Sequence, residues 1–164
     1  VPGAWNRPFA VLLPGAGGAD KILAPRVLSE TAAALTADGM DVVVAWGPAE
    51  RDRAAGIVDS GGSRVHLAPP TNLLELAGLL RDAEVVVGGD TGPVHLAASL
   101  GTPTVAVFLT TDPERNGPLG DRTAVVSGAA AGSRPTGSAR ARTVRPVSGT
   151  EISAAVRRLL ERAR

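Results

Sequence analysis

An acid, a hydroxyl and an imidazole follow one short apolar stretch in the second half of the chain. Asp90 and Thr91 come directly after Val85–Gly89, and His95 stands one helical turn beyond Thr91. Three valines in this stretch are typical of a buried parallel strand, its glycines permit a sharp turn, and Pro93 favours the first turn of a helix. Because free N–H groups at a helix start attract anions, this corner predicts an anion site. The simpler interpretation is a helix capped by Asp90 or Thr91, with a structural histidine.

A second candidate site follows the first apolar stretch, Phe9–Leu13. Its loop contains Gly15, Gly17 and Gly18 and ends at Lys21, the single lysine among 17 basic residues. The glycines lack the full spacing of a dinucleotide fingerprint, and the loop has no Walker-type ending. Lys21 is therefore interpreted either as a compact charge that neutralises a diphosphate or as an ordinary surface charge.

The third candidate is Glu50, which stands just past the apolar stretch 41–46. In dinucleotide-binding folds an acid near that strand end holds ribose, since one carboxylate can accept hydrogen bonds from two neighbouring hydroxyls. The alternative is a glutamate that merely suits the first turn of a helix. We interpret His66 as structural and Arg51 and Arg53 as solvated.

Expected strands and helices alternate along the chain. The expected strands are 9–13, 41–46, 64–67, 85–87, 104–109 and an edge strand at 123–126. The expected helices are 25–38, 47–58, 73–80, 93–100 and 150–164, with a turn at 60–63. This order predicts the α/β class, as a doubly wound parallel sheet of about six strands with helices on both faces. Ligands of such sheets bind beyond the carboxyl ends of the strands, where the loops 14–21, 47–50, 88–95 and 110–120 should meet.

Composition limits the function classes. With 44% hydrophobic and 20% charged residues among 164, the chain is typical of a globular domain. A net charge of +1 argues against nucleic-acid binding, and the absence of cysteine excludes disulfides and thiolate metal sites. We expect residues 1–8 to be the remnant of an interdomain linker and 9–164 to form one domain, with a long loop at 127–149.

Taken together, these motifs resemble the ADP-heptose lipopolysaccharide heptosyltransferases of glycosyltransferase family 9, which have the two-domain GT-B architecture. The most specific motif is the run Asp-Thr-Gly-Pro-x-His-Leu-Ala-Ala at 90–98. Supporting motifs, in the family's order, are Pro14 with the glycine loop and Lys21, Gly47-Pro48-Ala49-Glu50, Phe108 and Gly117-Pro118. The resemblance covers roughly residues 9–126 and concerns only the C-terminal, donor-binding half.

The resemblance implies roles for single residues. Asp90 would contact the donor sugar, Thr91 and Gly92 the diphosphate with His95 beside them, Lys21 the phosphates and sugar, and Glu50 the ribose. Further candidate loop contacts are Gly15, Gly17, Gly18 and Gly117. No catalytic residue is expected in this half, because the base that activates the acceptor would lie in an N-terminal domain.

The implied activity is inverting transfer of a heptose-like sugar from a nucleotide diphosphate, with ADP favoured, to a hydroxyl of a glycan or glycolipid. Neither metal nor cofactor is expected, and this chain alone should bind donor without transferring sugar. A cytoplasmic location is implied, compatible with peripheral association of the full-length protein with the inner face of the membrane.

Three departures from the family leave the donor open. The chain has Ala16-Gly17-Gly18 where family members often carry Ser or Thr, and Leu23-Ala24 where they often carry tryptophan. Cysteines common in the family's later loop are also missing. The alternative function is a nucleotide-sugar or dinucleotide-binding domain of an epimerase or oxidoreductase, and a third is a degenerate domain that mediates only protein contacts.

Overall fold

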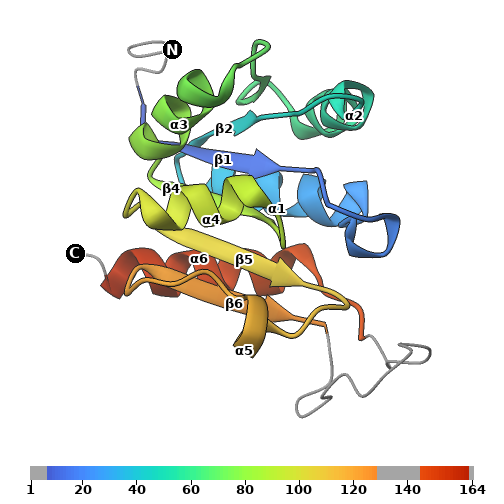
Figure 1. Ribbon diagram of the computed structural model, residues 1–164. Helices are drawn as coiled ribbons and strands as arrows, with labels where there is room; N and C mark the ends of the chain where they lie inside the picture. The colour runs from blue at the N-terminus through green and yellow to red at the C-terminus, as the bar shows by residue number, and fades with distance from the viewer. Residues whose placement is uncertain (1–6, 129–144, 163–164) are drawn as a thin grey trace.

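The strands form a single parallel sheet in the order β3-β2-β1-β4-β5-β6. The computed structural model describes residues 7–128 and 145–162 (Figure 1). The strands are β1 (Phe9–Leu13), β2 (Asp41–Val44), β3 (Val65–Leu67), β4 (Val85–Gly89), β5 (Thr104–Phe108) and β6 (Thr123–Ser127). Both β2 and β4 flank β1, so the chain winds outward in two directions from β1. The predicted doubly wound α/β sheet is therefore confirmed.

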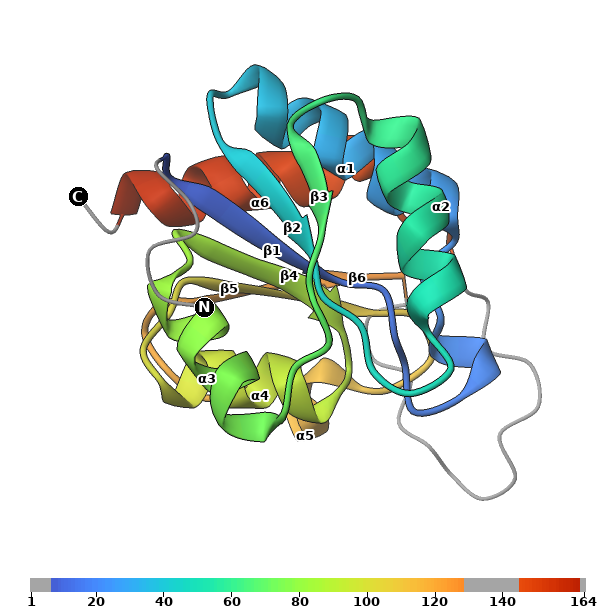
Figure 2. The same cartoon turned by 90° about the horizontal axis from the view of Figure 1, so that it is seen from above.

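Helices cover both faces of the sheet. They are the 3-10 turn η1 (Ala19–Lys21), α1 (Pro25–Ala37), α2 (Arg51–Gly61), α3 (Leu73–Asp82), α4 (Gly92–Ser99), α5 (Pro113–Asn116) and α6 (Gly149–Arg162). Figure 2 shows α1, α2 and α6 on one face and α3, α4 and α5 on the other. Of the described helices, none is both long and apolar enough to cross a membrane.

Alternation along the strands divides the core into two clusters. In β1, Ala10 and Leu12 face α1, α2 and α6, whereas Phe9, Val11 and Leu13 face α3 and α4. Successive side chains of a strand point to opposite faces, so an unbroken apolar run can fill both clusters. The two clusters hold the strands rigidly and so fix the positions from which the loops leave their carboxyl ends.

The two glycines after Val87 belong to strand β4, where the sequence predicted a turn. A Cβ on Gly88 would lie 2.8 Å from Cγ2 of Val94 in α4 and 2.9 Å from Cβ of Leu13 in β1. Gly88 is therefore needed for close packing between the strand and helix α4, and the turn begins only at Asp90.

The start of α2 also differs from the prediction. The helix begins at Arg51, because Gly47 to Glu50 form a turn in which the N–H of Glu50 donates to the carbonyl of Gly47 at 3.1 Å. At its other end α2 runs through Ser60 and Gly61, which were expected in a turn.

Smaller differences concern the second half of the chain. One short helix, α5, stands in the loop expected at 110–120, and β6 extends to Ser127. Of the expected linker, residues 1–6 lie outside the described residues, as do 129–144 of the expected loop.

Candidate functional site

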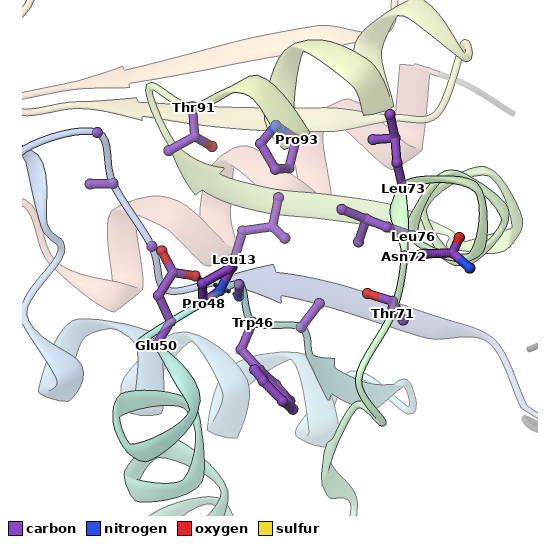
Figure 3. Close-up of a pocket in the computed structure, with 15 residues that line it drawn as sticks. Leu13, Trp46, Pro48, Glu50, Thr71, Asn72, Leu73, Leu76, Thr91 and Pro93 are labelled. Atoms are coloured by element: carbon purple, nitrogen blue, oxygen red, sulfur yellow. Dashed lines mark hydrogen bonds between the residues drawn. The ribbon is translucent and has the colours of Figure 1, made fainter.

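A pocket opens at the carboxyl edge of the sheet, where the chain turns in opposite directions from β1 and β4. Its volume is about 420 Å³. Figure 3 shows Thr91 and Pro93, at the start of α4, on one side of it, Leu73 and Leu76 of α3 on another, and Glu50 facing them from the loop before α2. The complete lining is Leu13, Gly15, Ala16, Gly17, Ala45, Trp46, Gly47, Pro48, Glu50, Thr71, Asn72, Leu73, Leu76, Thr91 and Pro93. Most of these side chains are apolar, as is typical of a small-molecule site with a few polar contacts.

Glu50 is the one ionisable residue in the lining of this pocket. Its Oε2 accepts a hydrogen bond from the N–H of Gly47 at 2.8 Å. Although Glu50 directly precedes α2, it makes no side-chain cap on that helix. Glu50 therefore stands at the N-cap position rather than within the first turn of α2, and it lines the cavity.

A cluster of polar side chains around Asp90 lies beside the pocket. Lys21 Nζ is 3.2 Å from Asp90 Oδ2, and Thr111 Oγ1 donates to the same oxygen at 3.0 Å. His95 Nε2 lies 3.5 Å from Oδ1, the outer limit of a hydrogen bond. Three segments that are distant in sequence, the β1–α1 loop, the β4–α4 corner and the loop after β5, therefore meet at one carboxylate.

These partners determine the charge of Asp90. Burial by itself raises the pKa of its carboxyl group, but the hydrogen bonds from Thr111, Lys21 and His95 and the charge of Lys21 outweigh burial. The net effect lowers the pKa of Asp90 below its ordinary value of 3.8. Asp90 is therefore ionised at neutral pH, and Lys21 is paired with it rather than a free surface charge.

Within the described part of the chain, no side chain caps the first turn of α4. Thr91 occupies the N-cap position, but its hydroxyl donates to the carbonyl of Gly89 at 3.4 Å and makes no cap hydrogen bond. Asp90 is directed to the cluster described above. The interpretation of this corner as a side-chain-capped helix is therefore wrong, and the start of α4 faces the space between pocket and cluster.

The predicted site residues do not all come together. Glu50, Thr91, Gly15 and Gly17 line the pocket, while Lys21, Asp90 and His95 form the neighbouring cluster. Gly92 begins α4 between them. Gly18 instead accepts a hydrogen bond from the N–H of Lys21 in η1, and Gly117 ends α5; neither lines the pocket.

Several residues of the site were not predicted. Trp46, Leu73 and Leu76 supply much of the apolar lining, and Thr111 supplies the second donor to Asp90. Trp46 is fixed by a hydrogen bond from its Nε1 to the carbonyl of Ala68 at 2.8 Å. The sequence did hold a signal for Trp46. It stands at the end of the second apolar stretch, and an aromatic residue at the carboxyl edge of a parallel sheet is a candidate for lining a ligand site. For Thr111 no signal existed beyond its position in the loop after a strand.

Among residues 7–128 and 145–162, no group of three or more His, Asp or Glu is arranged to hold a metal ion.

Comparison with known proteins identifies the family. The pattern of glycosyltransferase family 9 (heptosyltransferase) matches residues 2–142. Lipopolysaccharide heptosyltransferase 1 of Pseudomonas aeruginosa is 33% identical over 119 residues, which cover 73% of this chain and 33% of the relative. Lipopolysaccharide heptosyltransferase 1 of Escherichia coli K12 is 33% identical over 106 residues, which cover 64% of this chain and 33% of the relative.

Solved structures agree with this result. The E. coli heptosyltransferase WaaC with ADP has a TM-score of 0.70 and 31% identity over 73% of this chain and 38% of that chain. The family 9 glycosyl transferase of Veillonella parvula has a TM-score of 0.81 over 95% of this chain and 46% of that chain, at 20% identity. The UDP-GlcNAc 2-epimerase of Methanocaldococcus jannaschii has a TM-score of 0.59 over 93% of this chain and 38% of that chain, at 14% identity. The last two likenesses concern the fold alone.

The chain spans about a third of the length of the curated relatives it matches. The family pattern nevertheless covers most of the chain, including every residue of the pocket and of the Asp90 cluster. This chain belongs to glycosyltransferase family 9, the heptosyltransferase family.

Proposed function

We propose that this chain is the donor-binding domain of a glycosyltransferase that takes a heptose-like sugar from a nucleotide diphosphate, with ADP as the favoured nucleotide. The observation that carries the proposal is the pairing of an apolar, Glu50-lined pocket with a charged cluster at the same sheet edge. The two lie close together, because the loop after β1 passes over β4. A Cβ on Gly89 would lie 3.4 Å from the carbonyl oxygen of Lys21 and 3.9 Å from that of Gly15.

The two parts of the site suit different parts of a sugar nucleotide. The apolar lining suits a nucleobase, and the Glu50 carboxylate can accept hydrogen bonds from ribose hydroxyls. The diphosphate would lie at the start of α4, where Thr91 and Gly92 offer backbone N–H groups and Lys21 offers a positive charge. Asp90 would then accept hydrogen bonds from hydroxyls of the sugar.

This arrangement would stabilise the nucleotide diphosphate as the leaving group. As the bond between sugar and diphosphate breaks, negative charge grows on the diphosphate, and the helix N–H groups and Lys21 stabilise it. For Lys21 to reach the phosphates it must leave Asp90 or contact both groups at once. The acceptor, a hydroxyl of a glycan or glycolipid, and the base that deprotonates it would belong to an N-terminal domain.

Several features of the complete protein belong to the same proposal. Transfer would invert the configuration at the sugar, would need no metal, and would take place in the cytoplasm at the inner face of the membrane. Family membership supports these features, and the pocket of this chain supports only the donor half.

Calorimetric titration of the chain with ADP, UDP and GDP tests the proposal. We expect selective binding of ADP that weakens in Lys21→Ala. Selective binding of UDP or GDP would retain a nucleotide-sugar domain but overturn ADP as the donor nucleotide. If the folded chain binds none of the three, the donor-binding proposal for this chain fails. Detectable sugar transfer by these 164 residues alone would overturn the assignment of the acceptor site to another domain.

A further inference from the structure

The loop after β1 passes so close to Glu50 that residue 15 has no room for a side chain. A Cβ on Gly15 would overlap Oε1 and Cδ of Glu50 and lie 2.5 Å from Oε2. Gly15 is not among the described glycines with positive φ, so its backbone conformation is open to other residues. What this position requires is therefore space for the Glu50 carboxylate, not the conformational freedom of glycine.

Two further features hold the same carboxylate. The N–H of Gly47 donates to Oε2 at 2.8 Å, and a Cβ on Gly47 would lie 3.3 Å from that oxygen. Ala49, directly before Glu50, has φ of 64°, and it is the one non-glycine residue with positive φ in the described part of the chain. That conformation costs free energy in an ordinary residue, and such strain is concentrated at functional sites.

One oxygen of the held carboxylate is left for a ligand. Within the described residues, the Glu50 side chain makes one hydrogen bond, through Oε2, and no ion pair. Glu50 lines the pocket together with Gly15 and Gly47. Among the described residues no cation pairs with this carboxylate, so its free oxygen suits a neutral hydroxyl donor, and its negative charge disfavours a phosphate group at the same place.

We propose that Gly15 determines sugar specificity in the nucleoside pocket. By omitting a side chain, it lets Glu50 stand where Oε1 accepts a hydrogen bond from the ribose 2′-hydroxyl. The chain thereby selects ribonucleoside diphosphates over their 2′-deoxy counterparts. Gly15 acts through Glu50 as a positioning residue, and the inference rests on the proposed binding of a nucleotide in this pocket.

The variant Gly15→Ala tests this role. The nearest atoms to the new methyl group are the end of a flexible side chain, so Glu50 can turn away while the backbone stays in place. We expect the affinity for ADP to fall roughly tenfold, the value of a hydrogen bond to a charged acceptor, and the affinity for 2′-deoxy-ADP to stay the same. The readout is the ratio of the two dissociation constants from calorimetry.

Two controls separate positioning from general damage. Gly56→Ala introduces the same methyl group into α2, where, apart from the adjacent residues and the helix's own backbone, no described atom lies within 4 Å. It should leave both affinities and their ratio unchanged. In a Glu50→Ala background, Gly15→Ala should have no further effect on the ratio, because the residue through which it acts is gone.

The outcomes are distinct. Loss of the preference for ADP over 2′-deoxy-ADP in Gly15→Ala, and not in Gly56→Ala, supports the inference. A wild-type chain that binds both nucleotides equally, or a Gly15→Ala chain that loses both affinities to the same extent, overturns it and leaves the proposed function intact. A folded wild-type chain that binds neither nucleotide overturns the proposed function and this inference with it.

Discussion

The two acids of the site are held in opposite ways. Glu50 is placed by backbone, through the N–H of Gly47, the conformation of Ala49 and the absence of a side chain at Gly15. Asp90 is placed by side chains, through Lys21, Thr111 and His95. The Glu50 region therefore depends on shape, whereas the Asp90 region depends on charge, and each should respond to a different perturbation.

The largest expected effect concerns charge. Lys21→Ala should lower the affinity for ADP about tenfold to about a hundredfold, because it removes a charge-assisted contact with the diphosphate. The dependence of affinity on salt should also become weaker than in wild type, measured by calorimetry at about 50 mM and about 300 mM salt. Arg26→Ala, which removes an exposed cation paired with Glu30, is the matched control. If the two variants behave alike, Lys21 has no special part in binding.

Next in size is a change that removes charge but retains shape. Glu50→Gln keeps a carbonyl oxygen that can accept from the N–H of Gly47 or from a ribose hydroxyl. We expect its affinity for ADP to fall less than about tenfold, with the salt dependence of wild type. A loss of ADP affinity as large as that of Lys21→Ala would mean that the charge of Glu50 matters as much as the charge of Lys21. That result would contradict the distinction between a region that depends on shape and one that depends on charge.

A smaller effect should appear in stability against pH. The lowered pKa of Asp90 means that the folded state holds its ionised form more strongly than the unfolded chain does. The resulting stability is present above the ordinary pKa of 3.8 and is lost as the pH falls through the lower pKa of the folded state. Thr111→Val removes one donor to Asp90 and should cost about 1 kcal/mol at neutral pH.

Thermal unfolding of wild type and Thr111→Val between about pH 2.5 and about pH 7 provides the measurement. The difference in stability between the two proteins should narrow toward the acid end, as Asp90 takes up a proton. Thr110→Val is the neighbouring control, since its hydroxyl donates to Asp20 at 3.0 Å rather than to Asp90. A difference that does not change with pH would mean that Thr111 contributes by packing alone.

The smallest effect lies at the rim of the pocket. Asn72 accepts from the N–H groups of Leu74 and Glu75, both at 3.0 Å, and so caps α3, which carries Leu73 and Leu76 into the pocket. Asn72→Ala should lower the free energy of unfolding by up to about 1 kcal/mol without altering the salt dependence of ADP binding. Urea titration of each variant against wild type measures this loss. The control Leu74→Ala, at a residue 83% exposed, should leave the free energy of unfolding unchanged. Equal losses in the two variants would exclude capping as the cause.

The sequence predicted the Asp90 region better than it predicted the Glu50 region. The meeting of Lys21 and Asp90, 69 residues apart, followed from the rule that loops gather at the carboxyl edge of a parallel sheet. The apolar runs of β1 and β4 were long enough to predict those strands. The capping box of Asn72 and Glu75 likewise has a local pattern, an N-cap residue followed three positions later by a glutamate.

Contacts that depend on how distant segments pack could not be predicted from the sequence. Glycine ordinarily indicates a turn, but at Gly88 the approach of Val94 and Leu13 makes it part of a strand. Nothing local marks Ala49 for a positive φ, so the turn that places Glu50 directly before α2 was missed. Thr111 reaches Asp90 across 21 residues, and only the folded arrangement of two loops shows that contact.

The central position of β1 has a consequence for the order in which the domain folds. Ala10 of β1 pairs with Val85 of β4, a separation of 85 − 10 = 75 residues. Bringing such distant residues together lowers the conformational entropy of the chain before any stabilising contact has formed. Such pairings are therefore slow steps in folding. A chain emerging from the ribosome therefore possesses Gly15, Lys21 and Glu50 well before it can assemble them into a site. A nucleotide that binds the finished domain would stabilise it against unfolding. Before β4 pairs with β1, however, the pocket lacks Thr91 and Pro93 and the polar cluster lacks Asp90.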